Sequence, residues 1–233
     1  MVGRPASELA PPDSLFARLR AAAGVDWTGY TRHDFVLRLA EGSLPEASFR
    51  HYLVQDYLFL IQFARAYALA VYKSDSLADM RQAGAAMSAI LDLEMGLHVE
   101  FCAGWGLGEV AMAATPEATH TLAYTRYVLE RGMAGDLLDM HVALAPCIVG
   151  YAEIAAERLA DPATRLTDNP CRPWLDMYAG VEYRDVAAAE IAQLDRLFAR
   201  RGGEPRFDDL VRTFRTASRL EAGFWDMGLR LLE

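Results

Sequence analysis

Residues 45–72 read PEASFRHYLVQDYLFLIQFARAYALAVY, and their apolar side chains recur every three or four residues. That spacing places them along one stripe of an α-helix, and a proline at position 45 is typical of a helix start. The stripe carries Phe49, Tyr52, Leu53, Asp56, Phe59, Leu60 and Phe63. The stretch therefore predicts one long helix that turns aromatic and aliphatic side chains, with a carboxylate among them, toward a core.

The same helical period continues through nearly the whole chain, and alternating β-branched runs bounded by Asn-Gly or Asp-Gly turns are absent. We therefore predict an all-α fold, built as a helical bundle. Ser76 and the Thr115-Pro116 pair are expected to mark helix starts. The expected helices cover 13–23, 27–41, 45–72, 76–103, 116–131, 136–160, 171–181, 184–201 and 207–232. No repeat or linker divides the sequence, so we expect a flexible leader over 1–12 and a single domain over 13–233.

The amino-acid composition argues against some classes of binding partner. The 233 residues are 53% hydrophobic, and 23 Lys+Arg against 32 Asp+Glu give a net charge of −9. Such a chain repels nucleic acid and anionic membrane surfaces, and no window of about 18 uncharged apolar residues predicts a membrane span. Residues 1–13 lack the pattern of a signal peptide, so we expect a cytoplasmic protein. Lys73 is the only lysine, which disfavours chemistry built on a lysine imine.

The three cysteines are too few and too scattered for a disulfide framework. Cys102 and Cys171 are interpreted as small buried hydrophobes, the usual role of a reduced cysteine. Cys147 allows the same interpretation, but Pro146 precedes it inside the predicted helix 136–160. A proline there kinks a helix and frees a carbonyl near position 142, which favours a functional thiol as the alternative.

Several other polar groups lie on apolar helix stripes. Glu221 stands between aromatic residues in 207–232, where desolvation would raise its pKa and suit it to carry protons. Tyr124, Tyr151 and Tyr178 lie on the inner faces of three further predicted helices, where tyrosines most often serve the core. A pocket shared by these tyrosines, Asp56, Cys147 and Glu221 is the alternative, and spacing leaves both open.

A metal site has its own candidates. Glu94 and His98 lie four residues apart on one helix face, and Asp139 lies near His141. A carboxylate-bridged di-metal bundle would need two such ligand sets facing each other, and the sequence has one clear Glu/His pair. The alternative for Glu94 and His98 is a mutually bonded buried pair that supports the bundle. A haem protein would need an axial histidine such as His33 or His51, which nothing in the sequence marks as such.

Taken together, five segments resemble the TenA family, which comprises the thiaminase II or aminopyrimidine aminohydrolase enzymes. They are Phe49 to Asp56 (FRHYLVQD), Glu94 to His98 (EMGLH), Ala145-Pro146-Cys147 with Tyr151, Trp174 to Tyr178, and Glu221 to Trp225 (EAGFW). Their order along about 35–228 carries the resemblance, because each segment alone is short.

The resemblance implies a haem-oxygenase-like helical fold without haem, a homotetramer, and one pyrimidine pocket in each subunit. It places the family's nucleophile on Cys147, its acid on Glu221, and its pocket residues on Asp56, Phe59, Tyr124, Tyr151 and Tyr178. Phe59 departs from the tyrosine of some members, so a hydroxyl contact is lost there while ring stacking is kept.

The implied reaction converts 4-amino-5-aminomethyl-2-methylpyrimidine, and thiamin more slowly, to the hydroxymethylpyrimidine, with no metal or organic cofactor. The competing hypotheses are a di-metal oxygenase on the same bundle and a non-catalytic pyrimidine-binding regulatory protein.

Overall fold

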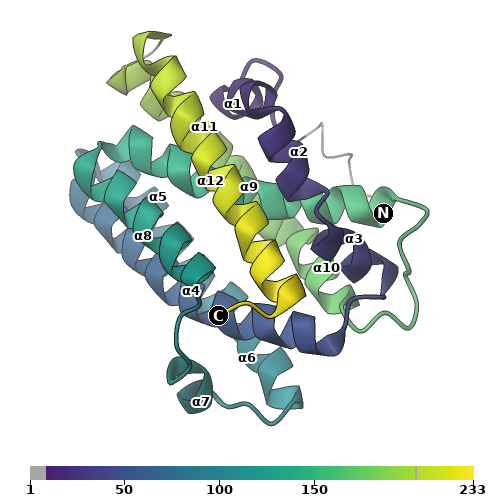
Figure 1. Cartoon of the computed structure of the whole chain (residues 1–233). Helices are drawn as coiled ribbons and strands as arrows, with labels where there is room; N and C mark the ends of the chain where they lie inside the picture. Colours follow the sequence, from purple (N-terminus) through teal and green to yellow (C-terminus); the bar gives the residue numbers. More distant parts are fainter. Residues whose placement is uncertain (1–8, 203) are drawn as a thin grey trace. The chain divides into compact units, whose positions relative to one another are not determined.

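A computed structural model of the chain describes residues 9–202 and 204–233. Across these residues the chain forms helices and no strand, which confirms the all-α prediction (Figure 1). Most of the expected leader, residues 1–8, lies outside the described residues.

Two compact units make up the fold. The first unit contains the residues up to Leu44 together with His141–Trp225, and the second contains Pro45–Met140 and Asp226–Glu233. The long helices α9 (Leu137–Ala160) and α12 (Phe207–Arg230) each begin in one unit and end in the other. A single domain over 13–233 stays a prediction.

The second unit is built around α4 (Glu46–Lys73), the helix that the sequence predicts over 45–72. Its N-cap is Pro45, and it packs against α5 (Leu77–Ala89), the π-helical turn η2 (Ile90–Glu94), α6 (Met95–Gly104), α7 (Glu109–Ala113) and α8 (Thr119–Ala134). Every residue from 52 to 60 is buried, so the middle of α4 is covered all round and not along one stripe only.

Lys73 closes the end of a neighbouring helix in this unit. Its ammonium donates hydrogen bonds to the carbonyls of Gly132, Met133 and Gly135, at the C-terminal end of α8. Cations are favoured there because the last carbonyls of a helix have no partners of their own. The only lysine of the chain therefore serves as a helix cap.

The first unit contains α1 (Leu15–Ala23), α2 (Val25–Thr31), α3 (Asp34–Glu41), α10 (Arg172–Tyr178), α11 (Val181–Arg201), the 3-10 turn η3 (Glu204–Arg206) and most of α9 and α12. Helix α1 packs against α2 and α11, and α10 packs against α11. The N-cap of α1 is Ser14, whose hydroxyl accepts a hydrogen bond from the backbone of Ala17.

Four details differ from the predicted helices. The range 27–41 is divided at Arg32 and His33, because the His33 side chain caps α3 by accepting the backbone N–H of Phe35. The range 76–103 contains the η2 turn, and the five-residue α7 was not expected. The predicted start at Thr115-Pro116 was wrong, since α8 begins at Thr119, whereas Ser76 caps α5 as predicted.

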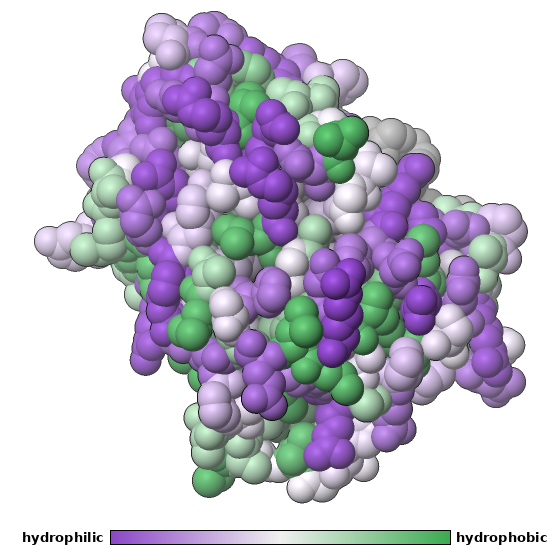
Figure 2. Space-filling model, viewed as in Figure 1, coloured by the Kyte–Doolittle hydropathy of each residue, from purple (hydrophilic) through white to green (hydrophobic). Residues whose placement is uncertain are grey.

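Helix α9 is the one described helix that is long and apolar enough to cross a membrane, but 94% of its most apolar window is buried inside the protein, as in a core helix. On the face drawn in Figure 2, hydrophilic residues predominate and apolar residues form small groups between them. Exposed apolar residues such as Tyr72 and Val110 are ordinary on protein surfaces.

Candidate functional site

All seven residues predicted for the site are buried, which is unusual for the two acids unless they have partners or a ligand. The second unit holds Asp56, Phe59 and Tyr124, and the first unit holds Cys147, Tyr151, Tyr178 and Glu221. Cys147 is 5% exposed, Asp56 3% and Glu221 1%. Each unit thus contributes its own group of candidates.

Asp56 receives two short hydrogen bonds on one carboxylate oxygen. The Tyr52 hydroxyl, one turn earlier on α4, donates to Oδ2 over 2.8 Å. Nε2 of His98, on α6, lies 2.7 Å from the same oxygen. A carboxylate oxygen has two lone pairs, so these contacts occupy Oδ2 and leave Oδ1 as the oxygen that they do not engage.

The His98 ring is held from its other side as well. Nδ1 lies 2.8 Å from the backbone carbonyl of Glu94, four residues earlier. Because a carbonyl only accepts, Nδ1 carries a hydrogen. The expected Glu94–His98 pair is therefore made through the Glu94 backbone, and the side-chain partner of His98 is Asp56.

The charge state of His98 follows from its surroundings. Complete burial opposes the imidazolium form, but the nearby Asp56 carboxylate, its hydrogen bond, and Glu94 outweigh that cost, so the pKa of His98 is raised above its ordinary value. The raised pKa favours the imidazolium form of His98 beside the Asp56 carboxyl group. Glu94 closes η2, a π-helical turn of the kind often found at functional sites.

Next to this pair, aromatic rings gather on α4 and α8. Phe59 lies 5.0 Å from Tyr124 and 5.0 Å from Phe63, measured between ring centroids. Phe59 is one turn after Asp56 on α4, so the ring pair and the carboxylate occupy adjacent positions of the helix. The structure thus brings together the three residues that the sequence predicted in this unit.

In the first unit, Cys147 lies on α9, and Tyr30 contacts this helix close to position 147. The Tyr30 hydroxyl donates a hydrogen bond to the carbonyl of Pro146 over 3.2 Å. A Cβ at Gly150 would lie 2.5 Å from the Tyr30 ring, so only glycine permits this close approach. Tyr30 therefore contacts α9 on both sides of position 147 in the sequence.

Tyr151, one helical turn after Cys147 on α9, lies in a cluster of aromatic rings. Tyr151 packs against Tyr178 at 4.9 Å, Trp174 at 5.6 Å and Trp225 at 5.3 Å between centroids. Cys147 lies one helical turn before Tyr151, and Glu221 lies one turn before Trp225. This arrangement places the thiol and the acid on two helices whose next turns are in contact.

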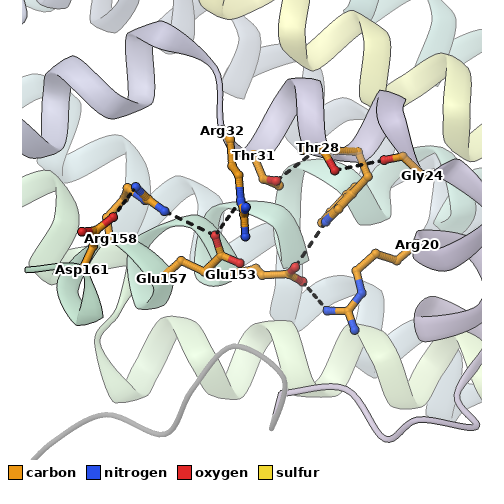
Figure 3. A network of polar contacts seen from close by, with 10 residues as sticks. Arg20, Gly24, Thr28, Thr31, Arg32, Glu153, Glu157, Arg158 and Asp161 are labelled. Carbon is orange, nitrogen blue, oxygen red and sulfur yellow. Dashed lines mark hydrogen bonds and ion pairs between the residues drawn. The ribbon is translucent and has the colours of Figure 1, made fainter. Parts of the chain in front are cut away.

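Helix α9 is fixed by a charged network, drawn in Figure 3. Glu153 accepts hydrogen bonds from Arg20 over 2.9 Å and from the Trp27 indole over 3.2 Å. Burial raises the pKa of Glu153, while Arg20 and Trp27 act in the opposite direction. Arg20 is on α1 and Trp27 on α2, so one carboxylate joins both helices to the helix that carries Cys147.

The residues considered for a metal or haem have other partners. Nδ1 of His141 lies 2.7 Å from Oε1 of Glu190, and Asp139 accepts the backbone N–H of Asp136. His33 caps α3, and His51 bonds the carbonyl of Leu232. Residues 9–202 and 204–233 contain no group of three His, Cys, Asp or Glu side chains suited to a metal ion.

Sequence reasoning paired His98 with Glu94 and missed its contact with Asp56, and it missed two residues of this description altogether, Tyr30 and Glu153. His98 and Glu153 carried a usable signal, since both are charged or titratable groups inside apolar helical stretches. Tyr30 carried none, because its contacts are with a backbone carbonyl and a glycine more than 100 residues away in the sequence.

Comparisons with known proteins fit this description. The model of the TENA/THI-4/PQQC family matches residues 21–231. A solved structure of a TenA family transcription regulator from Silicibacter sp. is 44% identical, with a TM-score of 0.88 over 94% of this chain and 98% of that chain. The TenA homologue protein from P. horikoshii is 28% identical, with a TM-score of 0.83 over 93% and 99% of the two chains.

A curated relative is named for an activity. The aminopyrimidine aminohydrolase of Halalkalibacterium halodurans is 34% identical over 215 residues, which are 92% of this chain and 95% of the relative.

Proposed function

Because the chain belongs to the TENA/THI-4/PQQC family, we propose that it is an aminopyrimidine aminohydrolase, a hydrolase acting on carbon–nitrogen bonds. Its proposed substrate is 4-amino-5-aminomethyl-2-methylpyrimidine, with thiamin as a slower one, and its product is the hydroxymethylpyrimidine. The reaction belongs to the salvage of the pyrimidine half of degraded thiamin.

The observation that carries this proposal is the environment of Asp56. A buried carboxylate that accepts both of these hydrogen bonds on one oxygen, next to a pair of aromatic rings, suits a flat heterocycle with an exocyclic amine. The 4-amino group of the pyrimidine donates a hydrogen bond to the Asp56 carboxylate. Phe59 and Tyr124 offer ring contacts worth roughly 0.5–1.5 kcal/mol each beyond burial. We assign the same stacking role to Tyr151 and Tyr178 of the first unit.

In the proposed reaction Cys147 is the nucleophile. Its thiolate adds to the ring carbon beside the substituted carbon, forming a carbon–sulfur bond. The bond between the exocyclic methylene carbon and its amine nitrogen then breaks, and this amine leaves with a proton. Water adds to the exocyclic methylene and gives up a proton, the carbon–sulfur bond breaks, and the aromatic ring and thiolate are restored. Glu221 carries these protons between thiol, leaving group and water.

Substitution of the thiol tests the assignment. Cys147→Ser is expected to lower kcat by about 1000-fold or more while the protein stays folded. Cys102→Ala and Cys171→Ala serve as matched controls and are expected to keep their turnover. Unchanged hydrolysis by Cys147→Ser would show that the nucleophile is assigned wrongly.

Alkylation provides a second measurement of the same assignment. Burial raises the pKa of Cys102 to about 11 and that of Cys171 to about 12, so neither presents an appreciable amount of thiolate at neutral pH. Iodoacetamide is expected to modify Cys147 first, with loss of activity in proportion, as followed by peptide mass spectrometry. Substrate analogues should protect it.

Oligomeric state and location belong to the proposal as well. We propose a homotetramer in the cytoplasm, to be checked by sedimentation and by fractionation of cells. The name of the Silicibacter protein favours a second candidate, a pyrimidine-binding regulator. Tight binding of the pyrimidine in calorimetry without any product would select that candidate over the enzyme.

A further inference from the structure

The Asp56–His98 contact contains a single proton whose location has consequences for recognition. Nδ1 of His98 already carries a hydrogen, which it donates to the Glu94 carbonyl. The 2.7 Å contact between Nε2 and Oδ2 requires one further hydrogen, from either partner. With the hydrogen on His98, Asp56 is a carboxylate whose charge is already balanced inside the protein.

We propose that His98 is a positioning residue for aminopyrimidine binding: it fixes Asp56 through Oδ2 as a charge-balanced carboxylate, so that Oδ1 alone receives the exocyclic amine. This inference rests on the proposed function and assigns a specificity role to a residue outside the seven site residues that the family resemblance implies.

Three features of the second unit support this role. His98 is fully buried and held at both ring nitrogens, so the ring has one orientation. Tyr52 donates to the same oxygen as His98, and together they fill its lone pairs. The acids that act on His98 are Asp56 from α4 and Glu94 from η2, and both favour the imidazolium form.

The chemical consequence concerns the kind of ligand. A bare buried carboxylate would select cations, because burying an unbalanced charge is costly. A carboxylate that is already paired selects a neutral group with an N–H donor at a fixed angle. The 4-amino group of a neutral pyrimidine meets that description, and a free metal ion or a simple ammonium does not.

Kinetics of the wild type and of His98→Gln provide the first test. Glutamine can still occupy the space but carries no charge, and KM for the aminomethylpyrimidine is expected to rise about tenfold with a smaller change in kcat. In an Asp56→Asn background, His98→Gln should add little, since it acts through Asp56. His141→Gln, in the other buried pair, is the matched control and should leave KM unchanged.

NMR of ring nitrogens gives a measurement that needs no substrate. In the wild type, both nitrogens of His98 should stay protonated above pH 6.5, and in Asp56→Asn they should titrate at lower pH. An unchanged KM in His98→Gln, additive effects in the double variant, or a neutral His98 at pH 6.5 would each overturn the inference. If the wild type neither binds nor hydrolyses the pyrimidine, the proposed function fails first; a normal wild type with an unaffected His98→Gln refutes only the role of His98.

Discussion

Two buried histidine–carboxylate pairs, one in each unit, have the same contact distance but different surroundings. His98 and Asp56 are 2.7 Å apart in the second unit, and His141 and Glu190 are 2.7 Å apart in the first. Asp56 stands one helical turn before Phe59, whose ring contacts Tyr124, and it accepts the hydrogen bonds of Tyr52 and His98 on one oxygen. A buried pair by itself therefore says little about function, and the groups next to the carboxylate say more.

Replacing each carboxylate in turn by its amide should give the largest difference in activity between the two pairs. Asp56→Asn is expected to lower kcat/KM by about 10- to 100-fold, because a charged acceptor for the substrate is lost. Glu190→Gln, equally isosteric, is expected to change kcat/KM by less than about threefold. Steady-state kinetics on the aminomethylpyrimidine, with circular dichroism to confirm folding, measure both. Equal losses in the two variants would end the distinction between the pairs.

The dependence of the unfolding free energy on pH provides a second test of the His98–Asp56 pair. Since folding raises the pKa of His98, the pair contributes its full stabilisation below the ordinary histidine pKa of about 6.5 and loses it as the pH rises through the folded value. The difference in unfolding free energy between wild type and His98→Gln should therefore be largest near pH 6 and shrink toward alkaline pH. Urea unfolding at several pH values checks this, and a difference that grows with pH would contradict it.

The serine caps of one helix in each unit are expected to give the smallest effects. Ser14 caps α1 in the first unit, and Ser76 caps α5 in the second, where its hydroxyl accepts the backbone N–H of Asp79 over 3.1 Å. Ser14→Ala and Ser76→Ala are each expected to cost about 1 kcal/mol of stability.

Thermal unfolding followed by calorimetry then reports whether the units unfold together. If they do, each variant shifts one common transition by a similar amount. Two transitions, each moved by only one of the variants, would show that the units unfold separately.

Much of the fold was predictable because it depends on local chemistry. The apolar period and Pro45 gave α4 to within two residues, and the hydroxyl of Ser76 identified the start of α5. The division at His33 escaped prediction because a histidine is a less common cap than serine. The η2 turn escaped because a single wide turn barely alters apolar spacing, and Thr115-Pro116 misled because the Pro116 carbonyl accepts a bond from Gln55 ahead of the helix.

The candidate site was predictable as residue types and only partly as contacts. Asp56 and Glu221 stood out as acids on apolar stripes, and both are buried. The partner of Asp56 was not predictable, since His98 lies 42 residues away and periodicity relates only neighbours within one helix. For the same reason His98 was paired with Glu94, the nearest acid on its own helix face.

The position of Lys73 has a practical consequence for anyone who labels or immobilises this protein. Reagents that acylate side-chain amines find one target in the whole chain, and that ammonium already holds three carbonyls at the end of α8. Acylation would remove both the charge and the donors, and the last turn of that helix would be expected to fray. Tags and cross-links are better directed to carboxylates or to an introduced surface cysteine.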